Sequence, residues 1–343
     1  MPSPLHDPVL QNDWHPVAIA STLTNGSMMP SQCLDTQLVI WRELNGTVHA
    51  WEDRCPHRGM KLSMGTLQAD SISCPYHGWT YGSEGRCKFV PALPELREAD
   101  LKGQVKTYLA RERYGLIWVC LGTPAEDILC FPEFDDAHLR KVWCGPYDVQ
   151  SSAPRIVENF LDMAHFAYVH EGILGEKSET AIRDYTVESF DDSHYGSGIW
   201  ARKCYAWQPR SNSLATNGSH VEYTYRVVRP LTAILTKEPQ SQEGFREAIS
   251  LHLQPLTETS TRVWIILALT NFESSDEELR TFQDTIFLQD KPIVENQQPL
   301  RLPLIPGAEM SMAIDRMSLA YRRYLTDKQL RYGVVTTNED RRC

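Results

Sequence analysis

Two short loops, each with one cysteine and one histidine, constrain the fold of this chain more than any other feature. The first is Cys55-Pro-His57 within the run RCPHRG, and the second is Cys74-Pro-Tyr-His77 within CPYHGWTY. Sixteen residues separate the two loops. Because thiolates and imidazoles are metal ligands, two loops of one design predict a fold that brings both of them to a shared metal centre.

A predicted β-hairpin leads into the first loop. Residues 36–52 read TQLVIWRELNGTVHAWE, in which two β-rich runs flank Asn45-Gly46, the strongest short signal for a hairpin. Zinc can also use two cysteines and two histidines, but zinc pairs usually space two ligands of one kind or open a helix. Here each loop supplies one ligand of each kind. The pattern therefore matches the Rieske [2Fe–2S] centre, in which two cysteines hold one iron and two histidines the other.

The chain is long enough for two domains, since it has 343 residues. The β-rich part continues through a glycine-containing turn at 82–85 and closes with an expected strand at 114–121. Gly122-Thr123-Pro124 follows and predicts a boundary. We therefore expect one domain over residues 1–122 and a second over 123–343.

A second group of candidate metal ligands lies in the run ENFLDMAHFAYVH, residues 158–170. It places Asp162, His165 and His170 in an apolar segment that we expect to be helical. Two histidines and one carboxylate are the ligand set of many oxygen-activating ferrous enzymes, although two histidines in a helix are more often structural. Positions five apart differ by about 140° around an α-helix. The sequence therefore predicts a π-turn or a break between the two histidines if both bind one metal.

The third ligand of such a site would come from residues 279–299. If this stretch is a helix, Phe282, Ile286 and Ile293 form its apolar side, and Asp290 points to the same side. Asp284 and Glu295 fall on the opposite face. A carboxylate aimed at a core needs a partner, so Asp290 is the candidate third ligand.

Alternating β-rich runs fill the part of the chain between these two stretches. Good examples are residues 194–207, 220–228, 245–253 and 261–271. His252 alternates onto the face opposite to its apolar neighbours, where it would either contact a substrate or be a hydrogen-bonded strand histidine. Residues 308–330 are expected to be helical, and the tail 338–343 is expected to fray.

Charge and composition exclude several other classes of protein. The net charge of −10 argues against nucleic-acid binding. The N-terminus lacks the basic and apolar regions of a signal peptide, and no 18-residue apolar run exists, so we expect a soluble cytoplasmic protein without a membrane partner. The nine cysteines have scattered spacings that do not indicate a disulfide framework.

The two metal motifs together resemble those of the Rieske non-haem iron oxygenases, over nearly the whole chain. The resemblance implies an α+β protein: an all-β Rieske domain followed by a helix-grip catalytic domain, an antiparallel sheet covered by helices. It implies that Cys55 and Cys74 bind one iron of the cluster and that His57 and His77 bind the other. High-potential relatives carry a serine where this chain has Trp79, so the resemblance implies a low cluster potential.

The resemblance also assigns roles in the second motif. It implies that His165, His170 and Asp290 bind a mononuclear iron(II). It implies that Asp162 carries electrons from the cluster-bound histidine of a neighbouring subunit in a head-to-tail homotrimer. Asn159, at the start of the motif, would support this network or lie in the pocket.

The implied reaction is O₂-dependent monooxygenation of a small aromatic or heterocyclic substrate, by hydroxylation or by oxidative N- or O-demethylation. The chain contains no GxGxxG loop, so NAD(P)H would act only through a separate reductase of the flavin or ferredoxin type. A ring-hydroxylating dioxygenase on the same scaffold is the alternative, because the iron ligands do not determine the position of attack. A pure electron-transfer protein would need only residues 1–122, so the second motif argues against it.

Overall fold

The computed structural model describes residues 7–337, so the predicted fraying of residues 338–343 lies outside the described part. The chain divides into two compact units between Ile128 and Leu129. Each unit has its own sheets and core. Among residues 7–337, no helix combines the length and the apolar character that are needed to span a membrane.

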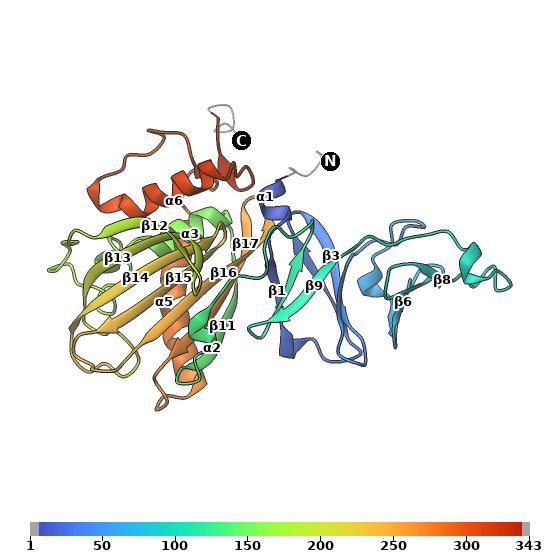
Figure 1. Ribbon diagram of the computed structural model, residues 1–343, viewed down its shortest axis with the longest axis horizontal. Helices are drawn as coiled ribbons and strands as arrows, with labels where there is room; N and C mark the ends of the chain where they lie inside the picture. The colour runs from blue at the N-terminus through green and yellow to red at the C-terminus, as the bar shows by residue number, and fades with distance from the viewer. Residues whose placement is uncertain (1–6, 338–343) are drawn as a thin grey trace. The chain divides into compact units, whose positions relative to one another are not determined.

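The first unit is built from two antiparallel sheets, and its described helices are short (Figure 1). The larger sheet has the order β1-β10-β9-β4-β3-β2, with β1 (His15–Ile19), β2 (Met28–Cys33), β3 (Thr36–Arg42), β4 (Val48–Glu52), β9 (Thr107–Arg113) and β10 (Leu116–Cys120). The smaller sheet runs in sequence order through β5 (Thr66–Gln68), β6 (Ser71–Ser73), β7 (Thr80–Gly82) and β8 (Cys87–Phe89). The helical segments are α1 (Pro8–Gln11), η1 (Ala20–Thr22), η2 (Leu62–Met64) and η3 (Glu98–Asp100).

The hairpin predicted at Asn45-Gly46 is confirmed. Strands β3 and β4 pair antiparallel, with Arg42 opposite Val48, and Gly46 in the turn between them has φ +96°. That backbone conformation suits glycine, because a Cβ atom disfavours positive φ. The strand β4 ends at Glu52 and leads directly into the first cysteine loop.

The second unit contains one large antiparallel sheet (Figure 1). Its order is β11-β17-β16-β15-β14-β13-β12, with β11 (Arg140–Val149), β12 (Thr186–Asp192), β13 (Gly196–Gln208), β14 (Ser219–Arg229), β15 (Thr232–Pro239), β16 (Glu247–Thr257) and β17 (Ser260–Leu269). The four β-rich runs of the sequence correspond to β13, β14, β16 and β17. A short parallel pair, β18 (Leu302–Pro303) and β19 (Val334–Val335), lies outside this sheet.

Helices pack along the large sheet and complete the second unit. They are α2 (Pro132–Asp135), α3 (Ala153–Leu161), α4 (Phe166–Val169), α5 (Asp276–Val294), η4 (Ala313–Asp315) and α6 (Arg316–Asp327). The helix α5 packs on β11, α3 packs on β15 and β16, and α6 packs on β12 and β13. An all-β unit followed by a helix-covered antiparallel sheet confirms the predicted fold class.

Two details of the expected helices are wrong. In α5 the buried side chains are Leu279, Gln283, Phe287 and Val294, whereas Ile293 is exposed. Phe282 and Ile286 do line a pocket on the sheet side of α5, as predicted, so only Ile293 departs from the predicted face. The C-terminal helix, predicted over residues 308–330, begins only at Arg316, and residues 308–312 are not helical.

Candidate metal centres and inner pocket

The two cysteine loops of the first unit lie side by side. Cys55 and Cys74 are buried within the core of the unit, together with Tyr81. The rings of His57 and His77 have centroids 4.6 Å apart, and both are more exposed than the cysteines. The structure therefore brings together the four residues that the sequence singled out, with the thiols on the core side and the imidazoles on the outer side.

Both loops close with the same backbone hydrogen bonds. The amide of Cys55 donates to the carbonyl of Met60, and that of Cys74 donates to the carbonyl of Trp79. The fourth residue after each cysteine is a glycine, Gly59 or Gly78, with φ of +74° or +70°. Because glycine adopts positive φ without strain, each chain can turn back within the same short span. The repeated design explains why the two motifs look alike in the sequence.

The side chains of these loops fit a Rieske cluster. His57 Nδ1 is buried and has no hydrogen-bond partner among the described residues, as expected for a nitrogen that binds a metal. Its ring stacks on Trp79, with centroids 4.4 Å apart and an interplanar angle of 8°. Burial, the neighbouring His77 and Arg58 lower the pKa of His57, so the neutral imidazole that a metal requires is favoured.

Tyr81 is a partner of the cysteines that the sequence did not predict. Its hydroxyl lies 3.2 Å from Cys55 Sγ. Burial and the neighbouring Cys55 raise the pKa of Tyr81, so its hydroxyl stays protonated and can donate to a thiolate. The prediction of a low potential considered only Trp79, which has no hydroxyl. Tyr81 supplies one hydrogen bond to sulfur that this prediction did not include.

Removing this hydroxyl should lower the potential of the cluster. In Tyr81→Phe the thiolate loses a donor that stabilises the reduced, more negative state. A net hydrogen bond of about 1 kcal/mol corresponds to roughly 40 mV for one electron, so we expect a drop of about 20 to 60 mV. Redox titration followed by visible absorbance measures it. An unchanged potential with an intact spectrum would show that the hydroxyl does not bond to sulfur.

The second motif is not one helix. The helix α3 ends at Leu161, and Asp162 follows with an extended backbone, φ −90° and ψ 132°. Asp162 Oδ1 accepts from the Ala164 amide, which stabilises the turn. His165 then caps the one-turn helix α4, and His170 ends it. The expected break therefore exists, but it lies before His165 and not between the histidines, where the predicted π-turn is absent.

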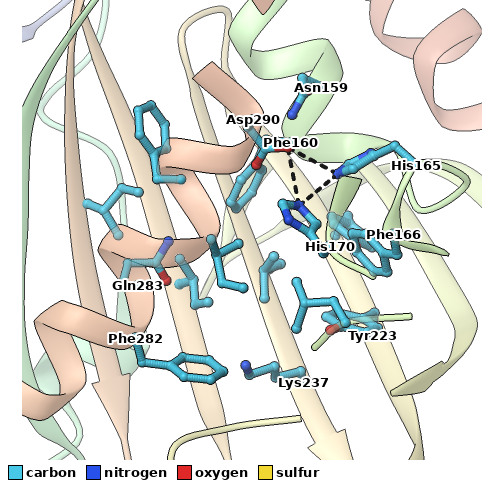
Figure 2. Close-up of a pocket in the computed structure, with 17 residues that line it drawn as sticks. Asn159, Phe160, His165, Phe166, His170, Tyr223, Lys237, Phe282, Gln283 and Asp290 are labelled. Carbon is cyan, nitrogen blue, oxygen red and sulfur yellow. Dashed lines mark hydrogen bonds and ion pairs between the residues drawn. The ribbon is translucent and has the colours of Figure 1, made fainter. Parts of the chain in front are cut away.

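The two histidines and Asp290 converge on one point (Figure 2). His165 Nε2 and His170 Nε2 are 3.2 Å apart, and Asp290 Oδ1 lies 3.4 Å from the first and 3.2 Å from the second. Asp290 comes from α5, more than a hundred residues further along the chain. All three side chains are largely buried, so a shared ligand would be held away from solvent.

The outer nitrogens of both imidazoles have acceptors. His165 Nδ1 lies 3.2 Å from Asp162 Oδ2, and His170 Nδ1 lies 2.8 Å from Gln289 Oε1. Each Nδ1–H therefore donates, and both Nε2 lone pairs face the same point. Two lone pairs and a carboxylate at such distances need a cation between them, which fits a mononuclear iron. The sequence did not predict a role for Gln289, although this residue directly precedes Asp290.

The electrostatics of the group also favour a positive charge. Burial opposes ionisation of His165, but its hydrogen bonds to Asp162 and Asp290 outweigh burial and raise its pKa to about 9. Burial likewise opposes the negative charge of Asp290, yet His165 and His170 outweigh it and lower the pKa of that carboxyl. Without a metal, His165 therefore carries a second proton, on Nε2, and a bound metal would displace that proton and use the lone pair.

An inner pocket opens from this group between the sheet and α5 (Figure 2). The space that protein atoms do not fill there is about 610 Å³, including the open solvent at its mouth. Its walls are mostly apolar and include Phe160, Phe166, Leu235, Ile249 and Ile265. Its polar groups are Asn159 beside the group of ligands, Lys237 and Gln283 further along, and the hydroxyls of Tyr223 and Tyr225.

Of the predicted site residues, His252 lies elsewhere. It is fully buried on β16, but it does not line the inner pocket, and its neighbour Ile249 does. His252 Nε2 lies 2.6 Å from Ser250 Oγ, and burial lowers its pKa to about 3. Its position is that of the hydrogen-bonded strand histidine and does not support contact with a substrate. Asn159 does line the pocket, and its amide has no hydrogen bond to a described residue.

Two family models match the chain. The Rieske [2Fe–2S] domain matches residues 13–108, and the vanillate O-demethylase oxygenase C-terminal domain matches residues 149–329. The probable methylxanthine N7-demethylase NdmC of Pseudomonas sp. (strain TJI-51) is 36% identical, over 69% of this chain and 83% of that protein. The methylxanthine N1-demethylase NdmA of Pseudomonas putida is 30% identical, over 93% of this chain and 89% of that protein.

Solved structures agree in fold. The structure of NdmA from Pseudomonas putida CBB5 with caffeine superposes with a TM-score of 0.80 at 29% identity. The match covers 94% of this chain and 92% of that chain. Both units of the present chain thus have counterparts in one protein, in the same order.

Proposed function

The chain belongs to the Rieske non-haem iron oxygenases, and on this premise we propose that it removes a methyl group from a small, neutral N-methylated heterocycle and releases formaldehyde. The observation that carries the proposal is the inner pocket, in which a two-histidine, one-carboxylate group opens directly into an apolar space with few polar groups. The relatives NdmA and NdmC are named as demethylases of methylxanthines, which are heterocycles of this kind.

The residues named above would hold the metals. Cys55, His57, Cys74 and His77 would hold the [2Fe–2S] cluster, and His165, His170 and Asp290 would hold one iron(II). When bound, these metals supply electrons and a site for the reductive activation of O₂. The electrons would come from a separate reductase of the flavin or ferredoxin type, since the chain has no dinucleotide-binding motif of its own.

The protein's own contribution is to hold ligands and substrate in place. Asp162 and Gln289 keep His165 and His170 in the tautomer that directs Nε2 to the metal. The apolar walls exclude water and place a methyl carbon beside the group of ligands. Hydroxylation of an N-methyl carbon gives a hemiaminal, which releases formaldehyde when its C–N bond breaks.

Gln283 is the side chain we propose for recognition of the ring. It is nearly buried on α5 and lines the pocket, and its amide makes no hydrogen bond to any other residue in the described range. An amide offers both a donor and an acceptor, so it can bind the mixed polar edge of a heterocycle. A site built in this way discriminates against rings that lack such an edge.

The test is formaldehyde release. Purified protein with a surrogate ferredoxin reductase and NADH should release formaldehyde from at least one of a panel of N-methylated purines and pyrimidines. In Gln283→Leu, which keeps the volume but removes the amide, kcat/KM for that substrate should fall about tenfold or more, as expected for one hydrogen bond. Preference for methoxybenzoates over every heterocycle, or indifference to Gln283→Leu, would contradict the proposal.

We also propose that the active form is a head-to-tail homotrimer. Large apolar side chains are exposed next to both sets of metal ligands. Tyr76, 61% exposed, contacts the ring of His77, and Tyr168, 65% exposed, lies on α4 between His165 and His170. Side chains of this size at such positions are typical of protein interfaces. An interface that joins these two surfaces would bring His77 of one subunit toward Asp162 of the next.

A further inference from the structure

A lysine stands in the inner pocket away from the metal ligands. Lys237 lies on β15, and only 5% of its side chain is exposed. Figure 2 shows it beside Phe282, while Asp290, His165 and His170 lie at the other end of the drawn residues. A buried ammonium is rare in proteins and needs partners for its charge and its hydrogens.

One of these hydrogens is donated in a hydrogen bond within the protein, and a carboxylate forms an ion pair with the ammonium. Lys237 Nζ lies 2.7 Å from Glu247 Oε2, and it donates to the carbonyl of Ser211 at 2.9 Å. Glu247 stands directly opposite Lys237 on the neighbouring strand β16, and 8% of its side chain is exposed. Among residues 7–337 no further acceptor contacts the ammonium. Because an ammonium has three N–H donors, at least one remains for a ligand even if Glu247 takes one of them.

Lys237 lines the inner pocket, so a ligand in that pocket can accept this hydrogen. A second cavity, with room for about one water molecule, shares Lys237, Phe282 and Gln283 with the inner pocket. The walls shared by the two cavities therefore offer one ammonium donor and one free amide. When one edge of a ligand lies beside the metal ligands, its opposite edge faces the Lys237 ammonium and the Gln283 amide.

We propose that Lys237 determines specificity by donating its third hydrogen to a carbonyl oxygen of the substrate, and that Glu247 makes the site select neutral over anionic substrates. The inference rests on the proposed demethylation and adds the chemistry of the substrate's far edge. A carbonyl held at Lys237 leaves the opposite edge of the ring, with its methyl group, toward His165, His170 and Asp290.

The selection follows from charge. Lys237 and Glu247 form a pair whose net charge is zero, so this end of the pocket offers no net positive charge to an anion. A carboxylate substrate would gain little from the compensated ammonium and would lose its hydration on entering an apolar pocket. A neutral carbonyl loses less hydration and still receives a hydrogen bond from a charged donor, which is stronger than one from a neutral donor.

Binding to the full-length holoprotein without reductase tests the inference, because no turnover occurs. Isothermal titration calorimetry would compare caffeine, a neutral N-methyl heterocycle with two carbonyls, and 4-methoxybenzoate, an anionic methyl ether. The double variant Lys237→Met/Glu247→Gln removes both charges and leaves neither one buried alone. The matched control, Arg262→Met/Asp148→Asn, removes another cross-strand ion pair of the same sheet that does not line the pocket.

We expect the double variant to bind caffeine about tenfold more weakly than wild type, with the control unchanged, as the loss of one charged hydrogen bond predicts. Glu247→Gln alone should tighten binding of 4-methoxybenzoate about tenfold, because the ammonium is then uncompensated. Equal affinity of wild type and double variant for caffeine, no binding of caffeine, or tighter binding of 4-methoxybenzoate by wild type would overturn the inference. If binding follows Lys237 but no formaldehyde is released, only the proposed reaction fails.

Discussion

Asp290→Ala is expected to reduce the iron content from about three to about two atoms per chain, while the visible absorbance of the Rieske cluster stays unchanged. Asp290 supplies the only carboxylate in the group formed with His165 and His170. Without it two neutral imidazoles remain, and they bind a divalent cation far more weakly than the full set does. Turnover should fall by at least about 100-fold, since even outer partners of metal ligands change activity by about 10- to 100-fold.

The helix α5 carries its own control. Asp284 lies six residues before Asp290 and accepts a hydrogen bond from the hydroxyl of Tyr147, away from the metal ligands. Asp284→Ala removes a carboxylate from the same helix and should retain about three irons. Iron analysis and the absorbance spectrum of both variants separate the two cases. Retention of the third iron in Asp290→Ala would refute the assignment of Asp290 as a ligand.

The candidate metal ligands of the two cysteine loops and of the run 158–170 were predictable because their spacing is local. Each cysteine loop repeats the same hydrogen bonds over a few residues, so its sequence shows its geometry directly. Asp290 was predicted from the helical period, since a carboxylate on the inward side of a helix needs a partner, and from the resemblance to the family. The fold class was implied by the resemblance to the family, and the Asn45-Gly46 hairpin and the alternating runs of the second unit agree with it.

The residues that depend on contacts between distant strands and helices were not predictable. Tyr81 reaches Cys55 through the pairing of the small sheet, and Lys237 meets Glu247 only because β15 and β16 pair in one register. The position of the break in the second motif depends on Asp162, whose side chain binds the Ala164 amide and so favours a turn over a continued helix. Two histidines five residues apart then converge from the two ends of a single helical turn, without a π-turn.

Asp162→Asn should abolish turnover but retain all the metal, unlike Asp290→Ala, which is expected to lose the mononuclear iron as well. Asp162 uses one oxygen for the Ala164 amide and the other for His165 Nδ1, whereas asparagine has a single amide oxygen. That oxygen can keep the Ala164 contact, so the turn should survive, while the NH₂ group replaces the oxygen that faces His165. The variant also loses the negative charge, which we propose couples His165 to the cluster-bound His77 of a neighbouring subunit. We expect about three irons per chain, unchanged spectra and a fall in turnover of at least about 100-fold.

Gln289 makes this prediction specific to the electron route. It holds the other histidine, His170, from within the same unit, and it carries no charge. Gln289→Leu should therefore weaken iron binding and leave the transfer of electrons intact in molecules that keep their iron. Stopped-flow reoxidation of the reduced cluster by O₂ in the presence of substrate distinguishes the two variants. If Asp162→Asn reoxidises its cluster at the wild-type rate, Asp162 only positions His165, and the electrons enter by another path.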